Sequence, residues 1–365
     1  MLRILMLTPD LDTPGGVSGL LATLRDFFSV GVEYFTVGKR LHESSWFAMF
    51  RRFLGDIRRF RRTLDASHYD VVHVNPSLEF KAVIRDGVFV ILARRAGVRT
   101  VVMFHGWKSD FEASLKGWRL CVFKRVFAKA DAVLVLASEL REKLEYWGFS
   151  APITVETTAF HDALIRSDTL DQKLRRRRGE VRLLFFSRVE RTKGIYETLD
   201  AYAMVKARRP LVKLTVAGSG TALDAAKQYA ADRRLPDISW VGYVQGREKA
   251  RVLEDADVFI LPTYTEGLPV AVLEAMAFGL AIVTRPVGGL RDIIIDGQSG
   301  YLIEGKDPAA FAGAIERLIE DPDLLEQMSR NNHCEAVARF AASAAARRLE
   351  ALYERLVCTH CQLDP

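Results

Sequence analysis

The sequence from Asp257 to Gly279 reads DVFILPTYTEGLPVAVLEAMAFG. Its first apolar run, Val258–Leu261, predicts a buried strand, because short apolar runs bounded by turn residues are typical of strands covered on both faces. Residues 270–278 predict a helix, and Pro269 suits its first turn, where a missing N–H costs little. The segment therefore predicts one strand-to-helix step of a parallel α/β sheet.

Short strand-like runs alternate with longer helix-period segments along the whole chain, which is typical of βαβ units. Each half holds enough strands for a doubly wound sheet with helices on both faces, and the length of 365 residues favours two domains. We therefore predict an α/β protein with two Rossmann-like parallel-sheet domains. The predicted strands are Arg3–Leu7, Val32–Thr36, Val71–Val74, Thr100–Phe104, Ala132–Ala137, Ile153–Thr157, Val181–Phe186, Lys213–Ala217, Ile238–Val241, Val258–Leu261, Ala281–Thr284 and Gly300–Leu302.

The domain boundaries follow from changes in composition. Residues 162–180 are charged, poor in large apolar groups and include the run Arg175–Arg178, so we predict a linker there. We place an N-terminal domain at residues 1–163 and a C-terminal domain at 164–340. A last helical segment, 341–365, could cross back to the N-terminal domain.

Composition limits the class of protein. Hydrophobic residues make up 49% of the chain, which excludes a disordered or fibrous protein. No run of about 18 apolar residues occurs, and Leu2–Leu7 is too short for a signal peptide, so we predict a cytoplasmic protein. Four cysteines are few for this length, which favours reduced thiols. Cys358 and Cys361 flank His360 in a CxxC pair, interpreted as a frayed tail, with a metal or redox role as the alternative.

Two stretches combine bases with large apolar residues: Trp46–Arg62, which contains six arginines and one acid, and Lys116–Lys129. At helical spacing this pattern offers apolar anchors and cations to an anionic lipid surface. It equally fits a solvated basic helix face whose apolar side joins the core. Nucleic acid is a third candidate, although no nucleic-acid motif accompanies the basic residues.

Glu266, Gly267 and Leu268 lie just ahead of the predicted helix at 270–278, and Glu274 lies inside it. Amide groups at a helix start and the positive end of its dipole favour a phosphate, and Gly267 lets backbone approach a ligand closely. Glu266 and Glu274 are carboxylates that can each accept two hydroxyl hydrogen bonds, as a sugar or a ribose offers. The segment therefore predicts a site for a ligand with both phosphate and hydroxyl groups.

Arg188 and Lys193 lie on the loop after the first predicted strand of the second half. One forked and one point cation could neutralise a diphosphate there. The alternative is a pair of exposed loop charges, which is what isolated lysines and arginines usually are.

Together these segments resemble the retaining glycosyltransferases of family 4, which have the GT-B fold of two Rossmann-like domains facing across a cleft. The resemblance covers most of the chain and is strongest over residues 185–302. Its motifs are the Glu-x7-Glu pair with Ala-Met-Ala-Phe-Gly at 275–279, Arg-x4-Lys-Gly at 188–194, Ala-Gly-Ser-Gly at 217–220, Val-Gly-Tyr-Val at 241–244, and Gly288-Gly289 before Asp292.

The resemblance implies a retaining transfer without a metal or other cofactor, with an acceptor-binding first domain and a nucleotide-sugar-binding second domain. It implies that Arg188 and Lys193 hold the donor diphosphate, that Glu266 contacts the donor sugar, and that His105 lies near the reacting sugar. These four residues are the predicted catalytic set. The predicted donor-binding residues are Gly15, Gly16, Gly218, Tyr243, Val244, Gly267, Leu268 and Glu274, with Glu274 on the ribose and Pro14-Gly15-Gly16 on the phosphates.

Other features receive no catalytic role. Glu156–Asp162 departs from the Asn-Gly-Val-Asp of many relatives, so no site is assigned there. Asn75–Ser77 and Trp107–Asp110 follow strands and are acceptor candidates. Two Asp-x-Asp patterns, at 10–12 and 255–257, resemble those of metal-dependent glycosyltransferases, but patterns this short are common by chance, and we predict no metal site.

The predicted partners are a nucleoside-diphosphate sugar, a saccharide or lipid-linked acceptor of bacterial cell-surface polysaccharide assembly, and an anionic membrane surface, without nucleic acid. Three alternatives stay open. A GT-B-fold nucleotide-sugar epimerase would use the same donor pocket, and a non-catalytic binding subunit would keep the fold. A Rossmann oxidoreductase is disfavoured because no predicted strand is followed by Gly-x-Gly-x-x-Gly.

Overall fold

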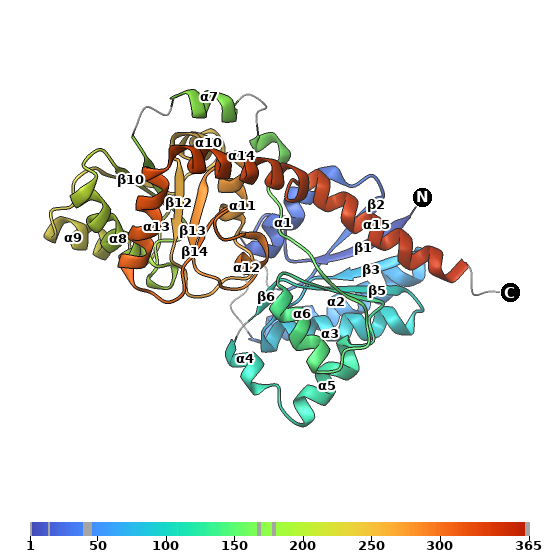
Figure 1. Cartoon of the computed structure of the whole chain (residues 1–365). Coiled ribbons are helices and arrows are strands. Elements are labelled where there is room, and N and C mark those ends of the chain that lie inside the picture. Colours follow the sequence, from blue (N-terminus) through green and yellow to red (C-terminus); the bar gives the residue numbers. More distant parts are fainter. Residues whose placement is uncertain are drawn as a thin grey trace. The chain divides into compact units, whose positions relative to one another are not determined.

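The computed structural model describes residues 2–13, 15–38, 46–107, 109–165, 169–176 and 180–361. Pro14, Lys108, Arg177 and Arg178 lie outside these ranges, as do the side chains of Trp46, Arg176, His360 and Cys361. The chain divides into two compact units, which are coloured along the sequence in Figure 1. Unit 1 comprises residues 1–159 and 342–365, and unit 2 comprises residues 160–341.

Unit 1 is built on a six-stranded sheet in the order β2-β1-β3-β5-β7-β8, with parallel neighbours throughout. The order reverses between β1 and β3, and this switch point is where open parallel sheets bind ligands. A separate parallel pair, β4 with β6, follows β3 and β5. The strands are β1 (Arg3–Thr8), β2 (Gly31–Thr36), β3 (Val71–Val74), β4 (Ser77–Leu78), β5 (Arg99–Phe104), β6 (Gly106–Trp107), β7 (Ala132–Val135) and β8 (Ile153–Val155).

Aromatic side chains fill much of the core of unit 1. Phe35, Phe60 and Phe89 are buried and meet edge to face, with ring centroids 5.1–6.2 Å apart. Buried rings of this size bring α2 and α3 onto the sheet. The helices are α1 (Gly16–Leu24), η1 (Arg25–Phe27), α2 (Trp46–Ala66), α3 (Phe80–Arg95), α4 (Ser109–Ser114), α5 (Trp118–Phe127), α6 (Ser138–Tyr146) and α15 (Ala342–Cys361).

Unit 2 has a second parallel sheet, in the order β11-β10-β9-β12-β13-β14. This is the Rossmann order, and its switch point lies between β9 and β12. Strands β12 and β13 are completely buried, and β9 is buried at its three central residues, because helices cover both faces. The strands are β9 (Arg182–Phe186), β10 (Lys213–Ala217), β11 (Ile238–Gly242), β12 (Val258–Leu261), β13 (Ala281–Thr284) and β14 (Gly300–Leu302).

The helices of unit 2 connect these strands and then run on beyond them. They are η2 (Asp162–Leu164), α7 (Thr169–Arg176), η3 (Arg191–Lys193), α8 (Ile195–Arg208), α9 (Leu223–Asp232), α10 (Gly246–Asp255), α11 (Val270–Ala277), α12 (Leu290–Ile293), α13 (Pro308–Glu320) and α14 (Pro322–Arg339). Pro269 is the N-cap of α11, one position earlier than the predicted first turn.

The predicted α/β fold is confirmed, because each predicted strand is present and its ends agree within two residues. The segment at 162–180 that is predicted as a linker contains a helix, α7, which packs against the rest of unit 2. Buried Lys173 of α7 donates a hydrogen bond to the carbonyl of Phe278 at 2.9 Å, and buried Leu170 packs at Gly279. A short helix with few apolar residues among charges leaves little periodic signal in the sequence.

Helix α15 belongs to unit 1 and is bound there by polar contacts. Arg348 pairs with Glu156, Nε to Oε1 at 2.7 Å and Nη2 to Oε2 at 2.9 Å. Glu350 accepts from Ser29 Oγ at 3.0 Å, and buried Tyr353 contacts His73 Nδ1 through its hydroxyl at 2.6 Å. The departure at Glu156 from the family pattern therefore has a structural role, which is to bind α15.

The described helices include none that is both long and apolar enough to cross a bilayer. Cys121, Cys334 and Cys358 are free and exposed.

We expect Tyr353→Ala to destabilise unit 1 by about 3–5 kcal/mol, as for removal of a buried aromatic side chain. Urea unfolding followed by tryptophan fluorescence would measure this, because four of the five tryptophans, at 46, 107, 118 and 147, lie in unit 1. Tyr353→Phe is the matched control and should cost only about 1 kcal/mol, the value of one hydrogen bond. Equal unfolding midpoints for wild type and Tyr353→Ala would show that the Tyr353 side chain adds nothing to the stability of unit 1.

Candidate active site

The loops after β9 and β12 start side by side, because the two strands are neighbours in the sheet of unit 2. Ligands of open parallel sheets bind outside the carboxyl ends of the strands at such a switch point. The loop after β9 carries Arg188 and Lys193, and the loop after β12 carries Glu266. Backbone atoms join the loops, since the Tyr264 amide donates to the Thr192 carbonyl at 2.8 Å.

Lys193 and Glu266 form an ion pair at this position. Lys193 Nζ lies 2.5 Å from Glu266 Oε1, and the side chains are only 12% and 10% exposed. The buried hydroxyl of Thr263 donates to the same carboxylate oxygen at 3.0 Å. The structure therefore brings together one predicted phosphate-binding cation and the predicted sugar-binding carboxylate, with their charges neutralised by each other.

Two glycines allow the loops of the site to approach this closely. Gly288 has φ +54°, and a Cβ there would lie 2.1 Å from the Glu266 carbonyl oxygen. Gly218 has φ +139°, and its Cβ would lie 1.9 Å from the Ser187 carbonyl oxygen. Both positions need backbone without a side chain. The Gly289 amide also donates to the Gly267 carbonyl at 2.6 Å, which fixes the segment ahead of α11.

Glu274, inside α11, is buried and pairs with Lys249 of α10, Oε1 to Nζ at 2.6 Å. Burial raises the pKa of Glu274 above its usual value, and the Lys249 charge opposes that rise. Glu274 and Lys249 line a cavity of about 370 Å³ together with Tyr243, which is exposed, and Val244, which is buried. Three predicted donor-binding residues therefore share one cavity.

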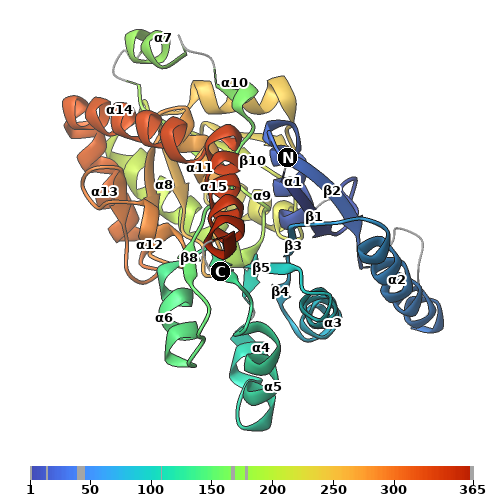
Figure 2. The same ribbon diagram turned by 90° about the vertical axis from the view of Figure 1, so that its right-hand side faces the viewer.

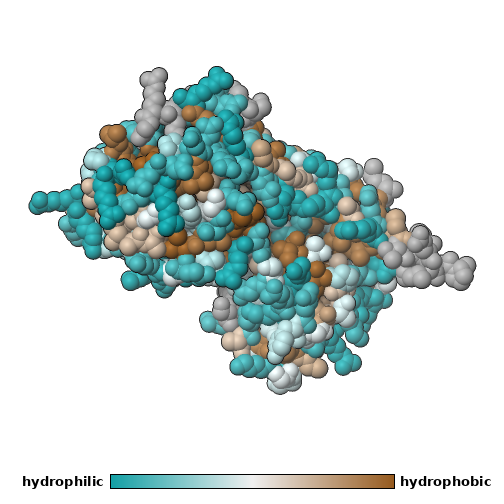
Figure 3. Space-filling view, viewed as in Figure 1, coloured by the Kyte–Doolittle hydropathy of each residue, from teal (hydrophilic) through white to brown (hydrophobic). Residues whose placement is uncertain are grey.

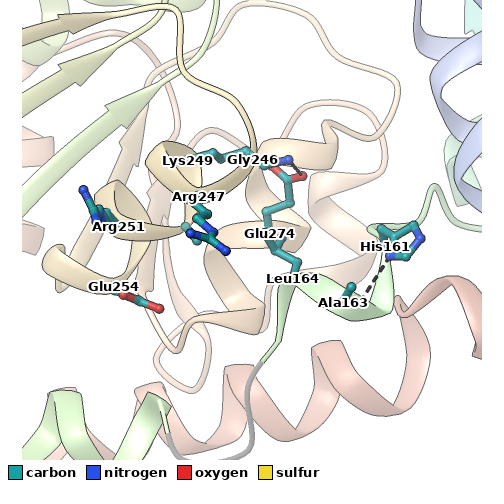
Figure 4. A pocket seen from close by; sticks show the side chains of 10 residues that line it. His161, Ala163, Leu164, Gly246, Arg247, Lys249, Arg251, Glu254 and Glu274 are labelled. Atoms are coloured by element: carbon teal, nitrogen blue, oxygen red, sulfur yellow. Dashed lines mark hydrogen bonds and ion pairs between the residues drawn. The ribbon is translucent and has the colours of Figure 1, made fainter.

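A larger cavity of about 780 Å³ adjoins Lys249 and Glu274. In Figure 4 the ends of these two side chains meet, and Arg247 projects from α10 beside them. His161 lies at the other end of the cavity, where its Nδ1 accepts from the Ala163 amide at 3.1 Å. The lining carries more basic than acidic groups. The basic residues are Arg247, Lys249 and Arg251, and the acidic residues are Glu254 and Glu274.

Arg188 differs from Lys193, because its side chain is 69% exposed and pairs with Glu190 at 2.7 Å. An exposed ion pair of this kind contributes little by itself and leaves the guanidinium able to turn to a ligand. Leu268, by contrast, is buried ahead of α11.

The first-half residues gather at the switch point of unit 1. Gly15 caps α1 and Gly16 begins it, at the end of the loop that follows β1. His105 follows β5, and its Nε2 lies 2.8 Å from Oδ1 of buried Asn75, which follows β3. Burial lowers the pKa of His105 to about 4, so its imidazole is neutral at physiological pH.

The two Asp-x-Asp patterns have structural contacts. Asp257 Oδ2 accepts from the Arg182 amide at 3.0 Å, and Asp10 Oδ1 accepts from the Asp12 amide at 3.2 Å. Within the described ranges, no cluster of three or more His, Cys, Asp or Glu side chains could hold a metal ion.

Sequence analysis missed Lys249 and Thr263 as parts of the site. Thr263 lies in the same loop as Glu266, but a buried hydroxyl leaves no pattern in the sequence. For Lys249 the available signal was the basic series Arg247, Lys249 and Arg251 directly after the Tyr243-Val244 stretch. As a whole, the site offers cations, buried carboxylates and helix-start amides, which suits a ligand with a diphosphate and several hydroxyl groups.

Comparison with known proteins gives two family matches. Residues 4–156 match the glycosyl transferase 4-like domain, and residues 166–333 match the glycosyl transferases group 1.

Individual relatives agree with these matches. The chain is 28% identical over 204 residues to the glycogen synthase of Mycobacterium tuberculosis. This aligned segment covers 55% of this chain and about half, 49%, of that protein. It is 26% identical over 315 residues to the putative glycosyltransferase EpsD of Bacillus subtilis, covering 81% of this chain and 79% of EpsD. Among solved structures, Anabaena HepE in complex with UDP and glucose superposes with a TM-score of 0.71 at 17% identity, covering 97% of this chain and 100% of that one. This chain therefore belongs to the group 1 glycosyl transferases of family 4, which have the GT-B fold.

Proposed function

We propose that this protein is a retaining glycosyltransferase that moves a hexosyl group from a nucleoside-diphosphate sugar to an acceptor hydroxyl. The observation that carries the proposal is the pairing of Lys193 with Glu266 at the β9/β12 switch point, ahead of the start of α11. The pair places a cation that can bind phosphate next to a carboxylate that can bind hydroxyl groups. A ligand in which a phosphate is bonded to a sugar needs both groups side by side.

The reaction breaks the bond between the anomeric carbon and a diphosphate oxygen. Lys193 and Arg188 stabilise the negative charge that develops on the diphosphate, together with the amides at the start of α11. Glu266 accepts hydrogen bonds from sugar hydroxyls once the diphosphate has drawn Lys193 away. The acceptor oxygen bonds to the anomeric carbon on the face that the diphosphate leaves, and its proton passes to the departing phosphate oxygen. This route retains the anomeric configuration and uses no metal.

The nucleotide part of the donor fits the cavity at Glu274. Its carboxylate would exchange the Lys249 ammonium for the ribose hydroxyls, and Tyr243 and Val244 would border the base. We propose UDP as the nucleotide, because HepE structures of the same fold contain UDP and UDP-glucose. Gly218, Gly267 and Leu268 would shape the donor site.

The acceptor is proposed to be a saccharide or lipid-linked saccharide of bacterial surface polysaccharide assembly, used at the cytoplasmic face of a membrane. The support is an apolar rim on unit 1. α2, α3 and α5 are neighbours, as Figure 2 shows, and each begins with exposed apolar groups. The apolar rim consists of Phe47, Phe50, Phe80, Ile84, Trp118 and Val122.

All these residues lie near the N-terminal ends of their helices. A helix that connects parallel strands starts at the carboxyl edge of the sheet, so the rim lies at the edge where Asn75 and His105 also lie. Trp118 is 73% exposed, and apolar groups interrupt the hydrophilic surface over α4 and α5 in Figure 3. Exposed Arg51, Lys81, Lys116 and Arg119 surround the rim and complement anionic headgroups.

We expect UDP to raise the thermal midpoint of the protein, with the shift unchanged by EDTA, since ligands that bind only the folded state stabilise it. GDP, ADP and NAD serve as comparisons. With a UDP-sugar and an acceptor, NMR should show free UDP and a glycoside of unchanged anomeric configuration. An isomerised nucleotide sugar formed without acceptor would instead identify an epimerase, and a response to NAD alone would contradict the proposal.

Lys193→Met and Glu266→Gln should each lower kcat/KM by about 10²- to 10³-fold, because each removes a preorganised partner of the transition state. Lys206→Met is the matched control. Lys206 is similarly covered, 10% exposed, and pairs with Asp237 at 2.6 Å, but it lies near the end of α8 that is remote from the carboxyl ends of the strands. Full activity in Lys193→Met would contradict the assigned role.

The double variant Phe47→Ser/Phe50→Ser should bind anionic vesicles about 100-fold or more weakly, since each buried Phe contributes about 1.5–3 kcal/mol. Co-sedimentation with phosphatidylglycerol-containing and pure phosphatidylcholine vesicles measures this, and added salt should weaken binding to the first. Tyr146→Ser is the control. Tyr146 is 89% exposed but is the last residue of α6, whereas the rim residues lie near the first residues of their helices. Equal recovery of wild type in the supernatant with and without vesicles would exclude the membrane partner.

A further inference from the structure

Asn75 occupies the switch point of the unit 1 sheet and joins three strands. It directly follows β3, and its Nδ2 donates to the carbonyl of Leu7, on β1, at 2.9 Å. Its Oδ1 lies 2.8 Å from Nε2 of His105, which follows β5. The residue is 5% exposed.

The Leu7 carbonyl decides the orientation of the Asn75 amide. A backbone carbonyl can only accept, so the NH2 group of Asn75 must face it and the amide oxygen must face His105. The opposite orientation would place two oxygens against each other. Because Oδ1 can only accept, the hydrogen bond to His105 requires a proton on Nε2.

We propose that Asn75 is a positioning residue for sugar transfer: it holds His105 as the Nε2–H tautomer, so that Nδ1 presents its lone pair to a sugar hydroxyl. The backbone supports the same placement, because the His105 amide donates to the Pro76 carbonyl at 3.1 Å. Nδ1 of His105 has no hydrogen-bond partner within the part of the chain that the structure describes. This inference rests on the proposed function, since the hydroxyl belongs to the substrate of that reaction.

A neutral imidazole is necessary for this arrangement, because a protonated ring has no acceptor nitrogen. Burial lowers the pKa of His105 to about 4. His73, two residues before Asn75 on β3, interacts electrostatically with His105 and has its own pKa lowered to about 3, chiefly by burial. His73 in turn contacts the hydroxyl of Tyr353. Both rings are therefore neutral above about pH 5. The Asn75 amide carries no charge, so it does not raise the pKa of either ring.

The first test is independent of activity. In protein labelled with ¹⁵N-histidine, long-range ¹H–¹⁵N spectra distinguish a protonated from an unprotonated ring nitrogen. His105→Gln would identify the His105 signals among those of the seven histidines. We expect the Nε2–H tautomer in wild type between pH 6 and 8. A proton on Nδ1, or an imidazolium in this range, would overturn the inference whether or not the protein transfers sugar.

The second test changes Asn75. Asn75→Asp places a carboxylate beside Nε2, which should raise the pKa of His105 by about 1–3 units relative to wild type, to between about 5 and 7. Its kcat should then fall as the pH is lowered from 8 to 5, whereas wild-type kcat shows no step from His105 in that range. Asn75→Ala should lower kcat about 10- to 100-fold at every pH, with a smaller change in the KM for the donor. This loss is smaller than the roughly 10²–10⁴-fold contribution of a positioned acid–base group, because Asn75 acts only through His105.

Two outcomes separate this inference from the proposed function. If wild type transfers sugar and Asn75→Asp keeps the wild-type pH profile, the role of Asn75 is contradicted while the transferase remains. If wild type has the expected tautomer but releases no nucleotide from any sugar nucleotide, the proposed function fails instead. Urea unfolding followed by tryptophan fluorescence, which reports mainly on unit 1, shows whether each Asn75 variant is folded.

Discussion

The reversal of strand order between β9 and β12 is the constraint on which the rest of unit 2 depends. The chain leaves β9 towards β10 on one side and leaves β12 towards β13 on the other, so the two connections diverge. Their divergence leaves the carboxyl ends of these two central strands uncovered by helices. Charged side chains can therefore be placed close to the centre of a sheet whose remaining surface is covered. The same reversal occurs in unit 1 between β1 and β3, where the groups at the strand ends are a neutral amide and a neutral imidazole.

Charges in such a position are expensive to bury unless they are paired. In unit 2 the cost is met by two Lys–Glu pairs, Lys193 with Glu266 and Lys249 with Glu274. Each pair links a lysine that precedes β12 to a carboxylate that follows it. A ligand that carries both anionic and hydroxyl groups can replace both members of a pair together, so no charge is left without a partner. The ion pairs therefore stabilise the unliganded site, and a ligand can still bind by exchanging with them.

The fold could be predicted well because parallel strands such as Val258–Leu261 are short apolar runs that helices cover on both faces, and this pattern is local. Several predicted site residues, such as His105 and Gly218, also lie at strand ends, since the positions of strand ends follow from the same pattern. The partners of those residues could not be predicted. Thr263 contacts Glu266, Lys249 contacts Glu274, and Asn75 contacts His105. Whether such side chains meet depends on the strand register and on the rotation of the helices, which the sequence pattern does not give. Helix α7 was missed for a similar reason, because its burial comes from two residues, Leu170 and Lys173, rather than from a repeated pattern.

Unit 2 is continuous in sequence, whereas unit 1 is assembled from two separate segments. The ends of unit 2 meet, because the Phe160 amide donates to the Phe340 carbonyl at 3.1 Å and Phe160 forms a β-bridge with Ala341. In topological terms unit 2 is an insertion into unit 1 with its two ends fastened together. During synthesis, unit 2 can complete its fold as soon as Ala341 has emerged from the ribosome. Unit 1 must wait with the sites for Tyr353 and Arg348 exposed until α15 arrives, so the first half of the chain is the last to reach its final structure.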